Sequence, residues 1–288
     1  MKVTRLHDAD EFWHQVAPLY TQDPVRHTVA LTVLKRVREG HGFGAETPNL
    51  LTIEDDGNLI GAVFHTPPAP YGLSAMPVQA ARAVAEFTLA EGIRPAGASG
   101  ETPNVEAFAA AWRELTGATS TVRMNLRLYR LVEAEFAPPA DVPGELVIAG
   151  EADLDVLVRF RRGFIIEADA NGDPDDAEQA VRGSMASGAA QVLWLVDGRP
   201  VSVAMASKPQ QGMSRVGMVY TPPEERSHGY GSAVTAGASQ WAIDQGTSDV
   251  VLFTDLANPI SNSIYQRIGY RPVMDSIEVA FAEADPLH

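Results

Sequence analysis

The chain of 288 residues contains no cysteine, which excludes cysteine nucleophiles, disulfide frameworks, zinc ribbons and iron–sulfur clusters. It also has no run of about 18 apolar residues, so the sequence predicts no transmembrane helix. The residues that follow Met1 include Lys2, Arg5 and Asp8, a polar start that is unlike the apolar core of a secretory signal peptide. We therefore expect a cytoplasmic protein with no membrane partner.

Basic side chains are scarce, since 22 Lys and Arg residues stand against 37 Asp and Glu residues and the formal net charge is -15. A surface of this charge repels phosphate backbones at long range, so we expect no nucleic-acid partner. Any anionic ligand has to be held locally. The acidic run at residues 171–176 lacks the register and the distal Glu of a calcium loop, and no metal site is expected.

The length suggests about two domain-sized units. Residues 136–144 contain three prolines and a glycine, and neither a helix nor a central strand continues through such a segment. We interpret this segment as a linker, which predicts domains at 1–137 and 144–288.

The two halves share a coarse order of helices, a hairpin, a helix, a strand and a helix. Turn residues separate apolar runs at 49–54 and 59–65 in the first half and at 191–196 and 200–206 in the second. In the second half a helical pattern at 232–245, a strand at 249–255 and a helix at 261–268 follow. We interpret the chain as one α/β fold with a mixed sheet (α+β) that occurs twice in tandem.

One stretch has the elements of an anion-binding site: a strand at 216–220, a loop with Gly229 and Gly231, and a helix that begins near Ser232. The first turn of a helix has free backbone N–H groups and a partial positive charge, and glycines let a phosphate approach them closely. An acidic protein can hold a pyrophosphate in this way. The glycine pair alone is a weak signal because it also occurs in plain turns, and it matches neither the Walker loop nor the dinucleotide fingerprint.

The loop resembles the acetyl-CoA loop of the GNAT acetyltransferase superfamily, whose pattern is Arg/Gln-x-x-Gly-x-Gly/Ala. Arg226, Gly229 and Gly231 fill that pattern, and Pro223 stands three residues before the arginine, as is usual in the family. A second family motif follows the next strand, and its positions are occupied by Asn258, Tyr265, Gly269 and Tyr270.

The resemblance covers the chain from about residue 140 to the C-terminus and implies an acetyl-CoA-binding GNAT domain at 144–288. The order of elements extends the resemblance to 1–137. There, however, the matching loop at 67–77 has four prolines and no such glycine motif. We therefore expect a degenerate GNAT-like domain that does not bind CoA, so the two units form a tandem of acyl-CoA N-acyltransferase folds.

The resemblance also implies roles for individual residues. The strand edge at Val219, Tyr220 and Thr221 pairs with the pantetheine arm. The pyrophosphate is held by the backbone amides of Arg226, Ser227, His228, Gly229, Tyr230, Gly231 and Ser232. Asn258 either contacts CoA or only caps the following helix.

The resemblance implies Tyr265 as the general acid, because it stands where the family's general acid usually sits. A thiolate that leaves a tetrahedral adduct gains from a nearby proton donor. The alternative is that Tyr265 only packs one face of the last helix. A protonated acceptor amine also needs a base, for which we predict Glu167, with Asp169 and Glu224 as other candidates.

The predicted function is acetyl-CoA-dependent N-acetyl transfer to a small amine by direct attack. The acidity of the chain suits a cationic acceptor. Two alternatives remain open: a non-catalytic CoA-binding sensor or scaffold, and an enzyme that acetylates a protein N-terminus or lysine.

Overall fold

The structure is a computed structural model that describes residues 1–40, 47–168 and 173–282. Asp169, one of the candidate bases, lies outside these residues. Within them, no helix is both long enough and apolar enough to span a membrane.

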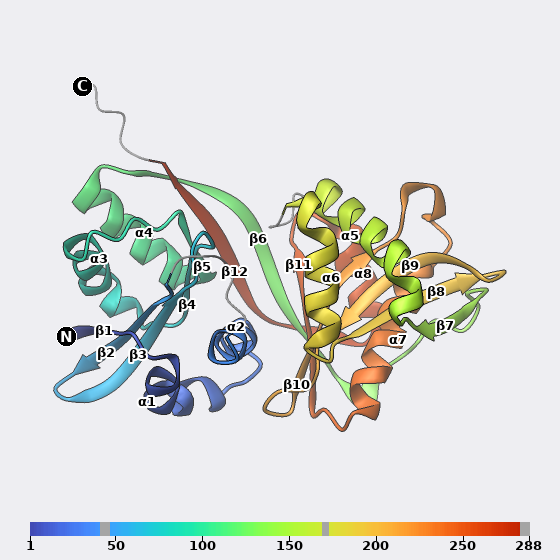
Figure 1. The fold of residues 1–288 in the computed structure, drawn as a ribbon, viewed down its shortest axis with the longest axis horizontal. Coiled ribbons are helices and arrows are strands. Elements are labelled where there is room, and N and C mark those ends of the chain that lie inside the picture. The colour runs from blue at the N-terminus through green and yellow to red at the C-terminus, as the bar shows by residue number, and fades with distance from the viewer. Residues whose placement is uncertain (41–46, 169–172, 283–288) are drawn as a thin grey trace. The chain divides into compact units, whose positions relative to one another are not determined.

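The same order of elements occurs twice along the chain, as Figure 1 shows. The first run comprises β1 (Lys2–Leu6), α1 (Ala9–Thr21), α2 (Thr28–Arg38), β2 (Asn49–Asp55), β3 (Asn58–His65), β4 (Tyr71–Ala75), α3 (Ala81–Ala90), β5 (Gly97–Glu101), α4 (Thr102–Thr116) and β6 (Thr119–Leu131). The second run comprises β7 (Glu145–Ile148), α5 (Leu154–Ala168), α6 (Ala177–Ala186), β8 (Ala190–Val196), β9 (Arg199–Ala206), β10 (Met213–Tyr220), α7 (Tyr230–Asp244), β11 (Asp249–Asp255), α8 (Pro259–Ile268) and β12 (Tyr270–Ala282). The predicted mixed α/β fold, used twice, is confirmed.

The chain divides into two compact units, and their boundary differs from the one expected at the proline-rich segment. The N-terminal unit contains Met1–Leu128, Asp255–Ala257 and Val273–His288, and the C-terminal unit contains Tyr129–Thr254 and Asn258–Pro272. The reason is that the last strand of each run is divided between the two units. Most of β12 belongs to the N-terminal unit, and the end of β6 belongs to the C-terminal unit.

In the N-terminal unit the strands are ordered β1-β2-β3-β4-β5-β12-β6. Strand β12 runs antiparallel to β5, with Ser276 opposite Glu101 and Ala280 opposite Gly97. A Cβ atom at Gly97 would lie 2.1 Å from the carbonyl oxygen of Val279, so glycine permits this close pairing. The core packs α3 and α4 against the sheet through buried side chains such as Val84 and Phe108.

In the C-terminal unit the order is β6-β11-β10-β9-β8-β7. Successive residues of β8 face opposite sides of the sheet, because strand side chains alternate. Val192 therefore joins the core under α7 and α8, and Leu193 joins the core under α5 and α6. Burial on both faces explains why consecutive residues of β8, such as Val192 and Leu193, are apolar.

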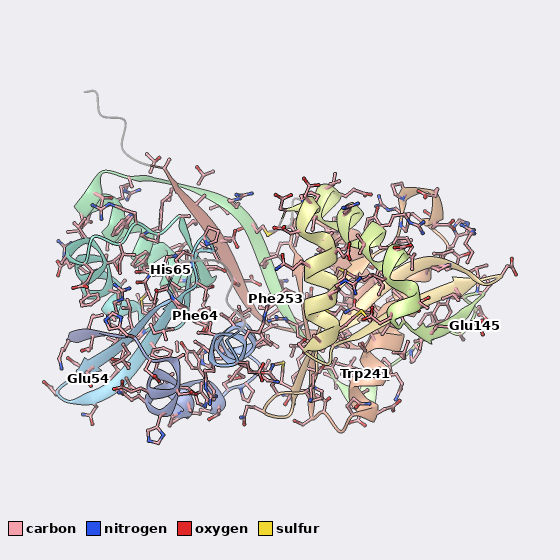
Figure 2. The ribbon with its side chains drawn as sticks, viewed as in Figure 1. Glu54, Phe64, His65, Glu145, Trp241 and Phe253 are labelled. Carbon is pink, nitrogen blue, oxygen red and sulfur yellow. The ribbon has the colours of Figure 1, made fainter. Side chains whose placement is uncertain are left out.

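The segment at 67–77, treated as a loop in the sequence analysis, contains the strand β4. Its Gly72 stands opposite Phe64 of β3, and a Cβ atom there would lie 2.1 Å from the Phe64 ring. Figure 2 shows Phe64 and His65 at the end of β3. A five-residue strand with an internal glycine and a proline on each side has little signal in the sequence.

Candidate functional site

Strand β10 diverges from its parallel neighbour β11 at the end that leads to the glycine loop. The pairing runs from Met213 opposite Asp249 to Val216 opposite Leu252, and no later residue of β10 pairs with β11 within the described chain. The register with β9 shifts between Gly217 and Tyr220, and Met218 has a positive φ of 48°. Such a bulge bends a strand and frees its backbone groups. The predicted pantetheine-binding edge, Val219 to Thr221, lies at this free end.

The loop after β10 is fixed to the sheet by side-chain hydrogen bonds. The Ser202 hydroxyl of β9 donates to the Tyr220 carbonyl at 3.0 Å and lies 2.8 Å from the Thr221 hydroxyl oxygen. The Arg226 Nε atom donates to the Thr221 carbonyl at 3.0 Å. The two ends of the loop are thereby held together before α7 begins.

Residues 227–232, which we call the amide row, carry backbone N–H groups that donate to no other group in the described part of the chain. The Arg226 N–H group, which was also expected to hold the pyrophosphate, instead donates to the Pro223 carbonyl at 3.3 Å. The first helical bond of α7 runs from the Ala233 N–H group to the Gly229 carbonyl, so the preceding N–H groups have no helical acceptor. Ser227 and Gly229 both have positive φ, of 68° and 84°. Alternating backbone of this kind turns N–H groups toward an anion. His228, as expected for a loop residue, stacks on the buried Tyr230 ring at 5.3 Å.

The two motif glycines have different physical roles. Gly229 adopts the left-handed conformation, and a Cβ atom there would lie 3.0 Å from Val142. Gly231 has ordinary helical backbone, and its Cβ atom would meet only the Thr221 hydroxyl at 3.4 Å. The packing of the chain therefore does not require glycine at 231. Glycine at that position weakens the helix, and no contact within the described chain accounts for it.

Glu167, at the C-terminal end of α5, is held by two groups of the predicted site. The Tyr220 hydroxyl donates to its Oε1 atom at 2.5 Å, and the Arg226 guanidinium donates to its Oε2 atom. The hydrogen bond from Tyr220 and the pairing with Arg226 lower the pKa of Glu167, so it is a weak base in this arrangement. Burial and the Glu167 carboxylate raise the pKa of Tyr220 to about 12.

Tyr265, on α8, is 8% exposed and belongs to the same apolar cluster as Val216, Leu252 and the half-buried Val219. Burial raises the pKa of Tyr265 to about 12. The phenol is therefore protonated at neutral pH, the state that a proton donor needs.

Asn258 caps α8, because its Oδ1 atom accepts from the Ser261 N–H group at 3.0 Å.

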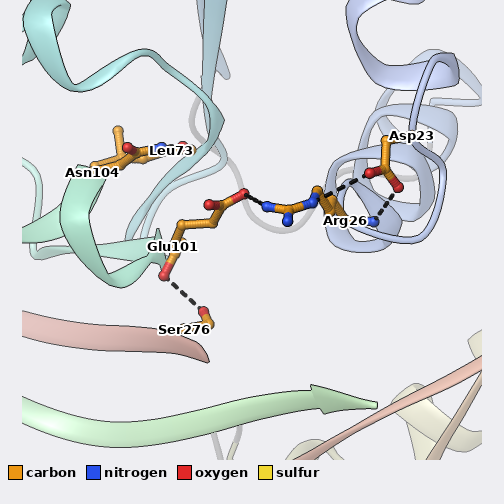
Figure 3. Close-up of polar contacts among 7 residues, drawn as sticks. Asp23, Arg26, Leu73, Glu101, Asn104 and Ser276 are labelled. Carbon is orange, nitrogen blue, oxygen red and sulfur yellow. Dashed lines mark hydrogen bonds and ion pairs between the residues drawn. The ribbon is translucent and has the colours of Figure 1, made fainter. Parts of the chain in front are cut away.

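Between β4 and α3, the described part of the N-terminal unit has no counterpart of the glycine loop. Between Ala75 and Ala81 the chain contains no glycine, Pro77 has no N–H group, and the Ala80 N–H group bonds to the Pro77 carbonyl. Near the end of β5 this unit carries a network of its own (Figure 3), in which Arg26 donates to Glu101 at 3.1 Å and pairs with Asp23. Its guanidinium is thus neutralised by carboxylates of the same unit.

Three residues with structural roles at the site escaped the sequence analysis: Gly163, Ser202 and Met218. A Cβ atom at Gly163 would lie 2.5 Å from the Tyr220 hydroxyl oxygen, so this glycine in the middle of α5 makes room for the tyrosine. A glycine inside a helical pattern was the available signal for Gly163. Neither Ser202 nor the bulge at Met218 has a local sequence signature.

Comparisons with known proteins agree with this geometry. Residues 161–270 match the model of the Acetyltransferase (GNAT) family. No curated protein sequence matches the chain significantly.

Solved structures share the fold over most or all of the chain. A GNAT-family acetyltransferase from Colwellia psychrerythraea is 13% identical with a TM-score of 0.63, over 98% of this chain and 100% of that one. A tandem GNAT protein from the clavulanic acid biosynthesis pathway is 15% identical with a TM-score of 0.63, over 100% and 99%. A GCN5-related N-acetyltransferase from Kribbella flavida is 21% identical with a TM-score of 0.52, over 83% and 87%. At these identities the likeness establishes the tandem fold.

Proposed function

We propose that this protein, which carries a GNAT acetyltransferase domain at residues 161–270, transfers an acetyl group from acetyl-CoA to a small amine. The observation that carries the proposal is the amide row, whose N–H groups have no acceptor within the described chain and lie at the start of α7. An anionic pyrophosphate fits N–H groups of this kind. The free end of β10 offers backbone groups to the amides of the pantetheine arm.

Acetyl-CoA supplies an acyl group that is activated as a thioester. The amine nitrogen attacks the carbonyl carbon and forms the C–N bond of a tetrahedral adduct. When the adduct collapses, the C–S bond breaks and Tyr265 donates its phenolic proton to the leaving sulfur. Tyr265 suits this role because its raised pKa, about 12, keeps the proton on the oxygen until the thiolate develops. The amine loses its own proton to a base or to water.

Glu167 as that base stays a prediction. Both of its oxygens accept hydrogen bonds, from Tyr220 and from Arg226, and its pKa is lowered. A base role therefore requires that Arg226 first leave the carboxylate.

The test is a thiol-release assay with acetyl-CoA and a panel of small amines, with a lysine-containing peptide as a separate arm. We expect turnover with at least one small amine and strongly reduced turnover for Tyr265→Phe with unchanged CoA binding. Equal rates for the two proteins would remove Tyr265 as the general acid. CoA binding without turnover on any acceptor would favour a sensor, and turnover on the peptide alone would favour a protein acceptor.

A further inference from the structure

Glu167 and Arg226 form an ion pair that connects α5 to the loop of the amide row. Arg226 directly precedes the amide row and also bonds to the Thr221 carbonyl, so the guanidinium spans from the loop to the end of α5. The Glu167 side chain is 35% exposed and the Arg226 side chain is 49% exposed. A pair this accessible to water contributes little net stability, so its separation costs little.

The Glu167 carboxylate is positioned by Tyr220, for which Gly163 makes room. Tyr220 approaches α5 only because residue 163 is a glycine, and its hydroxyl fixes the Oε1 atom at 2.5 Å. A glycine in a helix interior weakens the helix relative to alanine. The chain thus holds one oxygen of the carboxylate rigidly and leaves the other to a cation.

From this geometry we infer that Glu167 is the binding site for the ammonium group of the acceptor amine, and that Arg226 occupies the site until acyl-CoA is bound. The inference rests on the proposed function and names the residue that recognises its acceptor. The guanidinium stands where a substrate cation would bind, since both are N–H donors with a positive charge. When an anionic pyrophosphate is present at the amide row, Arg226 has a second anionic partner nearby. Glu167 then keeps its bond from Tyr220 and lacks a cation.

The consequence is a coupling between the two substrates. If CoA draws Arg226 away from Glu167, CoA strengthens amine binding, and the amine strengthens CoA binding by the same factor. The acceptor class is therefore a primary or secondary amine that is protonated when it binds.

The test measures the affinity of hexylamine by calorimetry, with and without saturating CoA, which cannot transfer an acetyl group. Hexanol serves as the neutral analogue. For the wild type we expect CoA to tighten hexylamine binding about tenfold, within the usual range of coupling between sites. We expect hexanol to bind with the same affinity in both conditions.

Four variants separate the roles. Arg226→Ala should bind hexylamine without CoA as tightly as the wild type does with CoA, and CoA should add less than a factor of about two. Arg226→Lys keeps the cation and should keep the coupling. Glu167→Gln should lose hexylamine affinity in both conditions. Arg182→Ala removes exposed ion pairs with Glu178 and Glu151, away from the amide row, and serves as the control with wild-type behaviour.

The outcomes are distinguishable. A wild-type protein that does not bind CoA overturns the proposed function and this inference with it. CoA binding with no hexylamine binding, with equal hexylamine affinity in both conditions, or with unchanged coupling in Arg226→Ala overturns the inference alone. Hexylamine affinity that Glu167→Gln leaves unchanged also overturns it.

Discussion

Replacing Gly231 with alanine should separate ligand binding from folding. The added Cβ atom meets only the Thr221 hydroxyl at 3.4 Å, an ordinary contact, and the backbone at 231 is helical. Alanine is a better helix former than glycine by about 0.5–1 kcal/mol. We therefore expect the free energy of unfolding to stay equal or to rise by up to that amount.

The same methyl group should weaken CoA binding, because it keeps the pyrophosphate away from the amide row. Loss of one hydrogen bond to a charged group costs about 1.5–3 kcal/mol, which corresponds to a roughly 10- to 100-fold weaker affinity. The assays are urea unfolding and calorimetric titration with CoA on the same preparations. A variant that is at least as stable as the wild type and binds CoA less tightly meets the prediction.

Two other glycines provide the controls. Gly183 on α6 has open space around its Cβ position, so Gly183→Ala should show a similar gain in stability with unchanged CoA affinity. Gly229→Ala places a side chain at φ 84° and near Val142, so it should lower stability by about 1–2 kcal/mol. Wild-type CoA affinity in Gly231→Ala would refute the assignment of the pyrophosphate site.

The remaining predictions concern protonation and assembly. Tyr265→Phe should lower kcat by about 100-fold or more, as expected for loss of a general acid, while the Kd for CoA stays unchanged; because the folded-state pKa is about 12, the wild-type rate should show no loss from this residue up to about pH 10. Burial lowers the pKa of His65 to about 4, below its unfolded value near 6.5, so stability should fall by up to about 3 kcal/mol as the pH drops from 6.5 to 4. Urea unfolding at both pH values measures this loss, and a loss of equal size in His65→Gln would contradict it. The separate fragments 1–137 and 144–288 should each fail to fold, since each lacks a strand of its sheet, and should fold when co-expressed. Cooperative unfolding of either fragment alone would contradict the claim that each fragment needs the strand that the other one carries.

The sequence predicted the parts of the fold that depend on local signals. The hairpins at β2–β3 and β8–β9, the strand β11 and the helix α8 follow from turn residues, apolar runs and caps, and the structure contains them. The glycine loop was located from the order of strand, glycine pair and helix start and from the family pattern that Arg226, Gly229 and Gly231 fill. Helix α7 begins at Tyr230, two residues before the expected start, because Gly229 is itself the N-cap.

What the sequence did not predict depends on partners far away in the chain. Gly72 is compatible with a strand only because the Phe64 ring covers it. Glycine at 163 is explained only by Tyr220, which occupies the space of a side chain there. The sequence likewise does not show which strand β12 pairs with, because pairing with β5 or with β11 uses the same backbone groups. A division at the proline-rich segment therefore separated two strands from the sheets they complete.

The end of β6 belongs to the C-terminal unit, so the first run contributes residues to the unit that holds the candidate active site. Tyr129, near the end of β6, is a residue of the first run that belongs to the C-terminal unit. Its hydroxyl donates to Asn262 at 2.9 Å and accepts from Gln266 at 3.2 Å, and both partners lie on α8, the helix that carries Tyr265. The first run thus contributes a residue that orients α8, the helix of the proposed proton donor, within the C-terminal unit. Loss of the glycine motif in the first run removes one loop, whereas loss of the run itself would remove a strand that holds α8 in position.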